Sequence, residues 1–177
     1  MAVNESHGNR TTYRLNLQYD GTEFAGWQLQ PDVRTVQRCL EDAIEILFQE
    51  RATVLSAGRT DAGVHATGQV AHVRTAVYRE PRAVLFGLNA NLPADIRIQQ
   101  VTIAGDLFHA RFSGRWRGYV YRIARRPMAV GRAYFWQCPF DLNVPAMRLA
   151  AKSILGSQSF RAFAHESPRE EHYLSDV

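Results

Sequence analysis

The chain has 177 residues, of which 46% are hydrophobic, and it carries 21 Lys and Arg against 17 Asp and Glu. A chain of this length forms one domain or two small ones and buries roughly two thirds of its unfolded surface. Its ordinary apolar content excludes a disordered protein. No apolar run exceeds the six residues Ala83–Leu88, and the polar start Met1–Arg10 is no signal peptide, so we expect no membrane contact.

Two cysteines, Cys39 and Cys138, are too few for a disulfide framework and match no metal-ligand spacing. The six histidines are scattered along the chain, so we expect no metal site. A reducing cytoplasm is the simplest location for such a protein.

The net charge of +4 is unevenly distributed. The segment Leu107–Phe140, here called the basic window, has no acidic residue, and outside it 14 basic residues stand against 17 acidic ones. Its seven arginines are Arg111, Arg115, Arg117, Arg122, Arg125, Arg126 and Arg132. A mildly acidic protein therefore carries one strongly basic segment.

Residues 1–11 are predicted to form a disordered polar tail. Tyr13–Tyr19 then alternates apolar and polar residues, which predicts a half-buried strand. Asp20–Arg34 reads as a loop. Thr35 is placed to cap a helix that continues to Phe48, since apolar residues recur there at spacings of three and four.

Two short strands are predicted at Thr53–Ala57 and Gln69–Arg74, with the loop Gly58–Gly68 between them. Pro81 opens a second helix that runs to about Leu88. Ile96–Ile103 alternates again and predicts another strand. The order β-α-β-β-α-β is that of a ferredoxin-like unit, so the predicted class is α+β.

We expect this first ferredoxin-like domain over residues 12–105 and a partial second one over residues 106–177. In the second, Tyr119–Ala124 predicts a strand, Asn143–Leu155 a helix, and His172–Val177 the opening of another strand. An incomplete unit would leave strand edges unpaired. We therefore expect that the chain is truncated or that something else completes its sheet.

The loop between the two short strands reads AGRTDAGVHA over residues 57–66. Gly58 and Gly63 have the spacing of a phosphate-binding P-loop, but Val64 and His65 stand where Lys and Ser/Thr are required. Asp61 would also repel a phosphate. A phosphate-binding hydrolase is therefore disfavoured.

The loop instead presents one carboxylate between glycines, which let a planar substrate approach the backbone closely. Asp61 is a candidate nucleophile or general base, with Arg59 helping to keep it ionised. The alternative is a tight turn in which Asp61 hydrogen-bonds its own backbone.

The basic window mixes arginines with aromatic residues, the combination that holds single-stranded and loop RNA. Two alternatives stay open: the aromatic residues belong to a core, and the arginines reflect genome composition. Arg117–Tyr121 fits the start of an RNA-binding signature of RRM domains but departs from it at Val120, Arg122 and Ala124. A non-catalytic RNA-binding module of RRM-like topology would keep this window without needing Asp61.

Together these motifs resemble the tRNA pseudouridine synthase A family, over about Tyr13 to Phe163. The matching stretches are Asp20-Gly21-Thr22, Phe24, Gly26-Trp27-Gln28, Gln30, Thr35-Val36-Gln37, Gly58–His65, Gly68-Gln69-Val70, Asn89–Pro93, Asp95-Ile96, Phe108–Ser113, Tyr119-x-Tyr121 and Ser159–Phe163.

The resemblance implies an isomerase that needs no metal or cofactor and converts uridine to pseudouridine at positions 38–40 of the tRNA anticodon arm. Asp61 would be the nucleophile, Tyr119 would stack on the target base, and Arg59 would hold the flipped nucleotide. The expected substrate-binding residues are Tyr119, Arg59, His65, Arg111 and Arg117. The implied architecture is two ferredoxin-like units that share an antiparallel sheet, in a homodimer that grips tRNA.

The sequence departs from the family in two places. Nothing matches the family's later Phe-x-x-His-Met-Val-Arg-like segment, whose basic residue pairs with the nucleophile. Arg117 also replaces the usual lysine and keeps its charge. We therefore expect the chain alone to be poorly stable, with little or no synthase activity.

Overall fold

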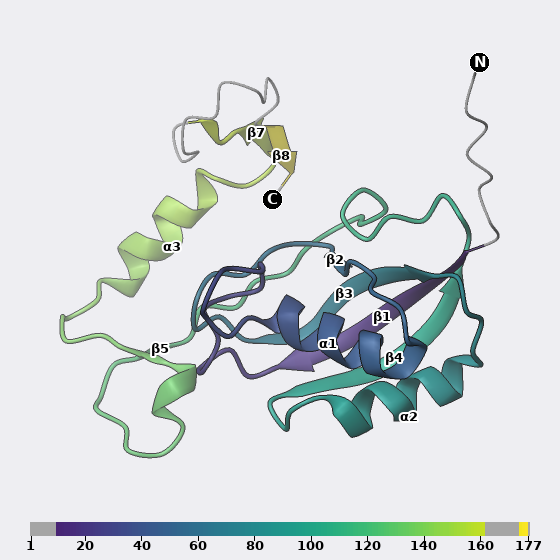
Figure 1. Ribbon diagram of the computed structural model, residues 1–177. Helices are drawn as coiled ribbons and strands as arrows, with labels where there is room; N and C mark the ends of the chain where they lie inside the picture. Colours follow the sequence, from purple (N-terminus) through teal and green to yellow (C-terminus); the bar gives the residue numbers. More distant parts are fainter. Residues whose placement is uncertain (1–9, 162–173, 177) are drawn as a thin grey trace. The chain divides into compact units, whose positions relative to one another are not determined.

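The computed structural model describes residues 10–161 and 174–176 (Figure 1). The described residues belong to two units, Met1–Val120 and Tyr121–Val177, which are treated separately below. No helix in these ranges is long and apolar enough to cross a membrane.

The first unit is built on a four-stranded antiparallel sheet with the strand order β2-β3-β1-β4. Two helices cover one face of this sheet (Figure 1). The elements in chain order are β1 (Thr11–Tyr19), α1 (Val36–Phe48), β2 (Leu55–Ser56), β3 (Ala66–Thr75), α2 (Pro81–Asn91) and β4 (Ile96–Ala104).

The core lies between the sheet and the helices, as the alternation in β1 predicts. Tyr13, Leu15 and Leu17 are fully buried, and they belong to the cluster that includes the apolar face of α1. The cap of α1 is also confirmed, because the Thr35 side chain accepts a hydrogen bond from the Arg38 N–H at 3.3 Å. Along α1, the 3.6-residue period of the helix places Leu40 on the face that is buried in the core.

The opposite side of the sheet, here called the open face, carries the alternate residues of the strands. On β1 these include Arg14, Asn16 and Gln18. His72 of β3 pairs with Arg14 in the sheet register and so lies in the same row, with Arg74 following it two residues later.

Several predicted boundaries need correction. The strand expected at Thr53–Ala57 is only the two residues of β2, whereas β3 begins three residues earlier than expected, at Ala66. The loop between them is therefore shorter than the predicted Gly58–Gly68. Helix α2 continues past Leu88 to Asn91, because Pro93 rather than the intervening residues prevents further helix.

Within its described residues, 121–161 and 174–176, the second unit contains two small strand pairs and one α-helix. β5 and β6 pair in parallel, and β7 and β8 pair antiparallel. The elements are β5 (Ile123–Ala124), the 3₁₀ helix η1 (Arg132–Tyr134), β6 (Trp136–Gln137), α3 (Val144–Lys152), β7 (Ser157–Ser159) and β8 (Leu174–Asp176).

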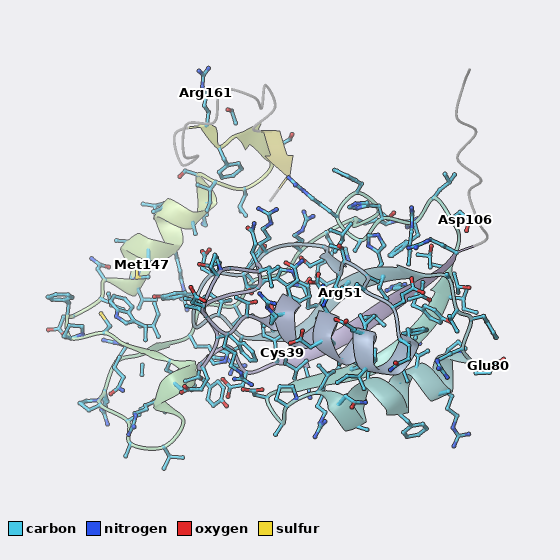
Figure 2. All side chains as sticks on the ribbon, viewed as in Figure 1. Cys39, Arg51, Glu80, Asp106, Met147 and Arg161 are labelled. Atoms are coloured by element: carbon cyan, nitrogen blue, oxygen red, sulfur yellow. The ribbon has the colours of Figure 1, made fainter. Side chains whose placement is uncertain are left out.

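The strand predicted at Tyr119–Ala124 is wrong for its first four residues, since β5 begins at Ile123. The helix predicted at Asn143–Leu155 is shorter than expected: α3 begins at Val144 and ends at Lys152, and the Asn143 side chain caps it by accepting from the Ala146 N–H at 3.0 Å. Figure 2 labels Met147 within this helix.

Two predicted segments fall partly outside the described residues. Of the expected disordered tail 1–11, residues 1–9 lie outside, and Thr11 is already the first residue of β1. Strand β8 lies inside the predicted strand His172–Val177, whose other residues lie outside. Residues 106–120, expected in the second domain, group with the first unit.

The core assignment predicts a contrast between two positions on α1. Leu40→Ala removes a fully buried side chain and should lower the free energy of unfolding by about 2–5 kcal/mol, measured by urea denaturation. Ile46→Ala changes a 56% exposed side chain on the same helix and should stay within about 0.5 kcal/mol of the parent. Equal losses would contradict the assignment.

Candidate active site on the glycine loop

The segment between β2 and β3, residues 57–65, is here called the glycine loop. Its tip is a β-turn in which the Val64 N–H donates to the Asp61 carbonyl at 3.2 Å. Gly63, the third residue of this turn, has φ +77°, a conformation that favours glycine. Asp61 is therefore the first residue of a turn, and its side chain is exposed.

The loop of residues 20–34 packs directly on the glycine loop. The Trp27 N–H donates to the Thr60 carbonyl at 2.9 Å, and a Cβ at Gly26 would lie only 2.7 Å from that oxygen. Gly26 also has φ +94°, and a Cβ at Gly21 would overlap the Val64 carbonyl oxygen. Only glycine at these positions allows the two backbones to approach so closely.

The 20–34 loop is itself fixed to the first unit. Phe24 and Trp27 of this loop are buried in the core of the first unit. The Arg34 guanidinium lies 4.1 Å from the centre of the Phe24 ring and donates two hydrogen bonds to the Asp95 carboxylate, at 2.7 and 2.9 Å. A bidentate pair of this kind orients both partners, so the loop presents a rigid surface to the glycine loop.

Side chains from the sheet support the glycine loop from below. The Tyr19 hydroxyl shares a hydrogen bond with the Thr60 hydroxyl at 2.9 Å. Gln69 donates to the Gly58 carbonyl at 2.8 Å and to the Tyr19 hydroxyl at 3.4 Å. Burial raises the pKa of Tyr19, and the nearby Tyr119 phenol adds a smaller effect in the same direction. Tyr119 thus lies within electrostatic reach of this support.

Arg117 joins the glycine loop to the chain that follows β4. Its Nη2 and Nε atoms donate to the Ala57 carbonyl at 2.6 and 3.1 Å, and Nη2 also reaches the Arg111 carbonyl at 3.2 Å. The predicted substrate-binding residue Arg117 therefore has a structural task, and it places Arg111 close to the loop.

His65 links the glycine loop to the 20–34 loop. Its Nδ1 atom lies 3.0 Å from the Gly21 N–H and 3.0 Å from the Asp20 carboxylate. Nδ1 accepts from Gly21 when it carries no proton and donates to Asp20 when it does, so the two contacts are alternatives. Either contact connects His65 of the glycine loop to the 20–34 loop.

The Asp61 carboxylate is left available. Within residues 10–161 and 174–176, no hydrogen bond or ion pair engages its side chain, so it does not stabilise its own turn. The Arg59 side chain is exposed as well, and the structure does not bring it into an ion pair with Asp61.

The basic window is divided between the two units. Arg111, Arg115 and Arg117 belong to the first unit, and the other four arginines belong to the second. All seven are exposed, and Trp116 and Tyr119 are 83% and 80% exposed. Most of the window's aromatic residues therefore lie outside the core, which answers one of the alternatives left open by the sequence.

Sequence reasoning missed the supporting roles of Tyr19 and Gln69. Tyr19 reads as an ordinary core residue at the end of an alternating strand, and Gln69 as a polar residue at the start of another. Their position beside a glycine-rich loop is the signal that would have indicated a role. The described part of the chain contains no group of three or more His, Cys, Asp or Glu suited to a metal ion.

The close packing of the two loops predicts that Gly26→Ala destabilises the chain. The added methyl meets the Thr60 carbonyl, and φ is positive, so the free energy of unfolding should fall by more than about 1 kcal/mol. Gly105→Ala is the matched control, because a Cβ there meets nothing within 4 Å. If urea denaturation gives both variants the parent's stability, the packing described here is wrong.

Comparisons with known proteins show which family the chain is similar to. A family profile described as tRNA pseudouridine synthase matches residues 17–113, more than half of the chain and wholly inside the first unit. Proteins named tRNA pseudouridine synthase A are similar to it. One from Chloroflexus aurantiacus is 48% identical over 161 residues, 90% of this chain and 58% of the relative.

A relative of the same name from Alcanivorax borkumensis is 44% identical over 86% of this chain and 58% of its own length, and one from Escherichia coli O9:H4 is 43% identical over 84% and 56%. The chain thus spans less than three fifths of the length of these relatives. Both loops of the candidate site lie within the matched residues, and the chain belongs to the tRNA pseudouridine synthase family.

Proposed function

We propose that this chain carries the catalytic centre of an isomerase that converts uridine to pseudouridine in tRNA, with Asp61 as nucleophile. The observation that carries the proposal is the exposed, unengaged Asp61 carboxylate on a loop held from three directions. A carboxylate held rigidly and open to solvent is suited to attack a bound nucleotide.

The reaction balances without an added reagent. The bond between C1′ and N1 of the uridine breaks, the uracil turns while it stays bound, and a bond forms between C1′ and C5. C5 loses a proton and N1 gains one, so substrate and product are isomers and no redox or group-transfer partner is consumed. Asp61 forms a covalent link to one fragment while the base turns, and this link is broken again once C1′ and C5 have joined, which releases the Asp61 carboxylate.

The target uridine must leave its stack to reach Asp61, at a cost of a few kcal/mol. Tyr119 supports this step, since its exposed ring offers a stacking surface and its phenol lies within electrostatic reach of Tyr19. Arg59 and Arg111, both exposed, would hold the phosphates on either side, and His65 and Arg117 would position the loop that carries Asp61.

We further propose the anticodon arm, positions 38–40, as the substrate region. The first unit would be a ferredoxin-like domain, which its element order and the sheet order β2-β3-β1-β4 support. The second unit would be part of a similar domain that shares the sheet, in a cytoplasmic homodimer. The alternative, a non-catalytic RNA-binding module, is not favoured, because the similar proteins are named as synthases.

The decisive variant is Asp61→Ala. Because the chain spans only 58% of the length of the Chloroflexus aurantiacus relative, the assay uses both the chain itself and a chimera in which Tyr13–Phe163 replaces the matching part of that relative. Pseudouridine formed in an anticodon-arm RNA is measured by mass spectrometry after cyanoethylation. Asp61→Ala should lower the rate of the chimera by about 10³-fold or more, because the nucleophile is lost.

Asp42→Ala, an exposed aspartate on α1, is the control and should leave the rate within about twofold of the parent. RNA affinity should be unchanged by Asp61→Ala. Activity that survives this variant would refute the nucleophile assignment, and a chimera that binds RNA without forming pseudouridine would favour the binding module. The unextended chain should show little activity.

RNA binding should weaken steeply with salt, because arginines that contact phosphates release counterions. Arg115→Gln should reduce the slope of log K against log salt concentration by about one. Arg38→Gln removes the same charge from α1, away from the basic window, and should leave the slope unchanged. Binding that does not respond to salt would show that the window is not the docking surface.

A further inference from the structure

The residues that follow β4, 106–117, run across the first unit and are here called the crossing segment; Asp106 near its start is labelled in Figure 2. They carry Arg111 and Arg117 and lead directly to Tyr119. The crossing segment forms no helix or strand. Its position therefore depends on side chains that reach it from the sheet.

His72 of β3 makes the most buried of these contacts. Its side chain lies on the open face of the sheet, and the residue is only 3% exposed. The Nδ1 atom accepts a hydrogen bond from the Ala110 N–H at 3.2 Å, and Ala110 itself is 2% exposed. A backbone N–H buried in this way needs an acceptor, and His72 supplies it.

Aromatic contacts extend from the same ring along the crossing segment. The His72 ring lies 4.8 Å from that of His109 and 5.8 Å from that of Phe108, both edge to face. His109 in turn lies 4.5 Å from Phe112. Arg74, two residues along β3, donates to the Asp106 carbonyl at 2.7 Å. The segment is thus fixed to β3 before it reaches the arginines.

The hydrogen bond from Ala110 defines the protonation state of His72. An Nδ1 atom that accepts carries no proton, so the ring is the neutral tautomer with hydrogen on Nε2. Burial lowers the pKa of His72, and the neighbouring His109 and Arg74 lower it further. A hydrogen bond with the Leu55 backbone has a smaller effect and raises the pKa. Arg14 faces His72 from β1 and adds another positive charge to the row.

We infer that His72 is a positioning residue for the proposed reaction: as a neutral acceptor for Ala110 it fixes the crossing segment on the open face, so that Arg111, Arg117 and Tyr119 stand beside the glycine loop. The expected effect of His72 on RNA binding rests on the proposed function. The contact itself is independent of that function, because it exists in the free chain.

Arg117 provides the path from His72 to the catalytic loop. It lies seven residues after Ala110 and donates to the Ala57 carbonyl at the start of the glycine loop. If Ala110 leaves His72, the crossing segment loses its buried attachment between Arg74 and Arg117. Arg117 is then no longer held where its guanidinium can donate to both the Ala57 and the Arg111 carbonyls.

The inference also fixes the sign of a pH dependence. Protonation of Nδ1 removes the acceptor, and a lowered pKa means that the attachment is fully present above about pH 6.5 and is lost as pH falls through the lower folded-state pKa. His109, Arg74 and Arg14 are the charged or titratable groups that face the ring, and His109 and Arg74 favour its neutral form.

The test compares His72→Leu, which removes the acceptor, with His72→Asn, whose amide oxygen can replace Nδ1 but cannot titrate in this range. Protection of the Ala110 amide against hydrogen exchange and affinity for an anticodon-arm RNA are measured at pH 7.5 and then in steps toward acid for as long as the chain stays folded. At pH 7.5, His72→Leu should lose about tenfold in protection and several-fold in affinity. His72→Asn should retain most of both and should not share the loss that the parent shows as the pH falls.

Thr102→Ala is the control. Thr102 lies in the same row of the open face, opposite Arg14, and should leave both readouts unchanged. Should His72→Leu fail to fold, His72→Asn and the parent's pH response decide alone. The inference is overturned if Ala110 protection is the same in all variants, or if His72→Asn keeps the parent's acid loss. If Ala110 behaves as expected while the parent does not bind RNA, the inference about the attachment stands and the proposed function fails.

Discussion

The close approach of two backbones, at Gly26 and at Thr60, determines the rest of the site. The Trp27 N–H and the Thr60 carbonyl form a hydrogen bond that exists only because residue 26 has no Cβ. This contact places the 20–34 loop directly behind the turn that carries Asp61. The exposed carboxylate is consequently attached to a buried core through backbone atoms as well as through side chains.

The supports of the glycine loop come from elements far apart in sequence. Tyr19 and Gln69 reach it from the sheet, His65 attaches it to the 20–34 loop, and Arg117 attaches it to the crossing segment. A catalytic group must be held to within a fraction of an ångström of its productive position. The first unit holds the loop on several sides and leaves Asp61 exposed, as the proposed role of Asp61 requires.

Local patterns in the sequence predict the first unit well. The alternation of β1, the cap at Thr35 and the helix opened by Pro81 all depend on neighbouring residues, and all three are confirmed. The pattern from Tyr119 onward predicts less well: Tyr119 and Tyr121 alternate as in a strand, but among the described residues the strand there begins only at Ile123. The elements of the second unit are short and lack the extended apolar periodicity on which such predictions depend.

The sequence predicts candidate residues for the site but does not predict their contacts. The pattern of the glycine loop indicated Asp61 as the reactive group, and the comparisons confirm the family. The contacts of Arg117 with Ala57 and of His72 with Ala110 join residues 60 and 38 positions apart, and no local pattern encodes them. From the sequence alone, Arg117 is a candidate cation for RNA and His72 is a polar residue within an apolar strand. Their partners Ala57 and Ala110 are known only from the fold.

A structure of the chain bound to an anticodon-arm RNA would test the central claim most directly. The proposed function predicts a uridine turned out of its stack, its ring against Tyr119, with C1′ or the base at about 3–3.5 Å from the Asp61 carboxylate. RNA that lies on the helix-covered face, or a uridine that remains stacked while Asp61 faces solvent, would contradict it.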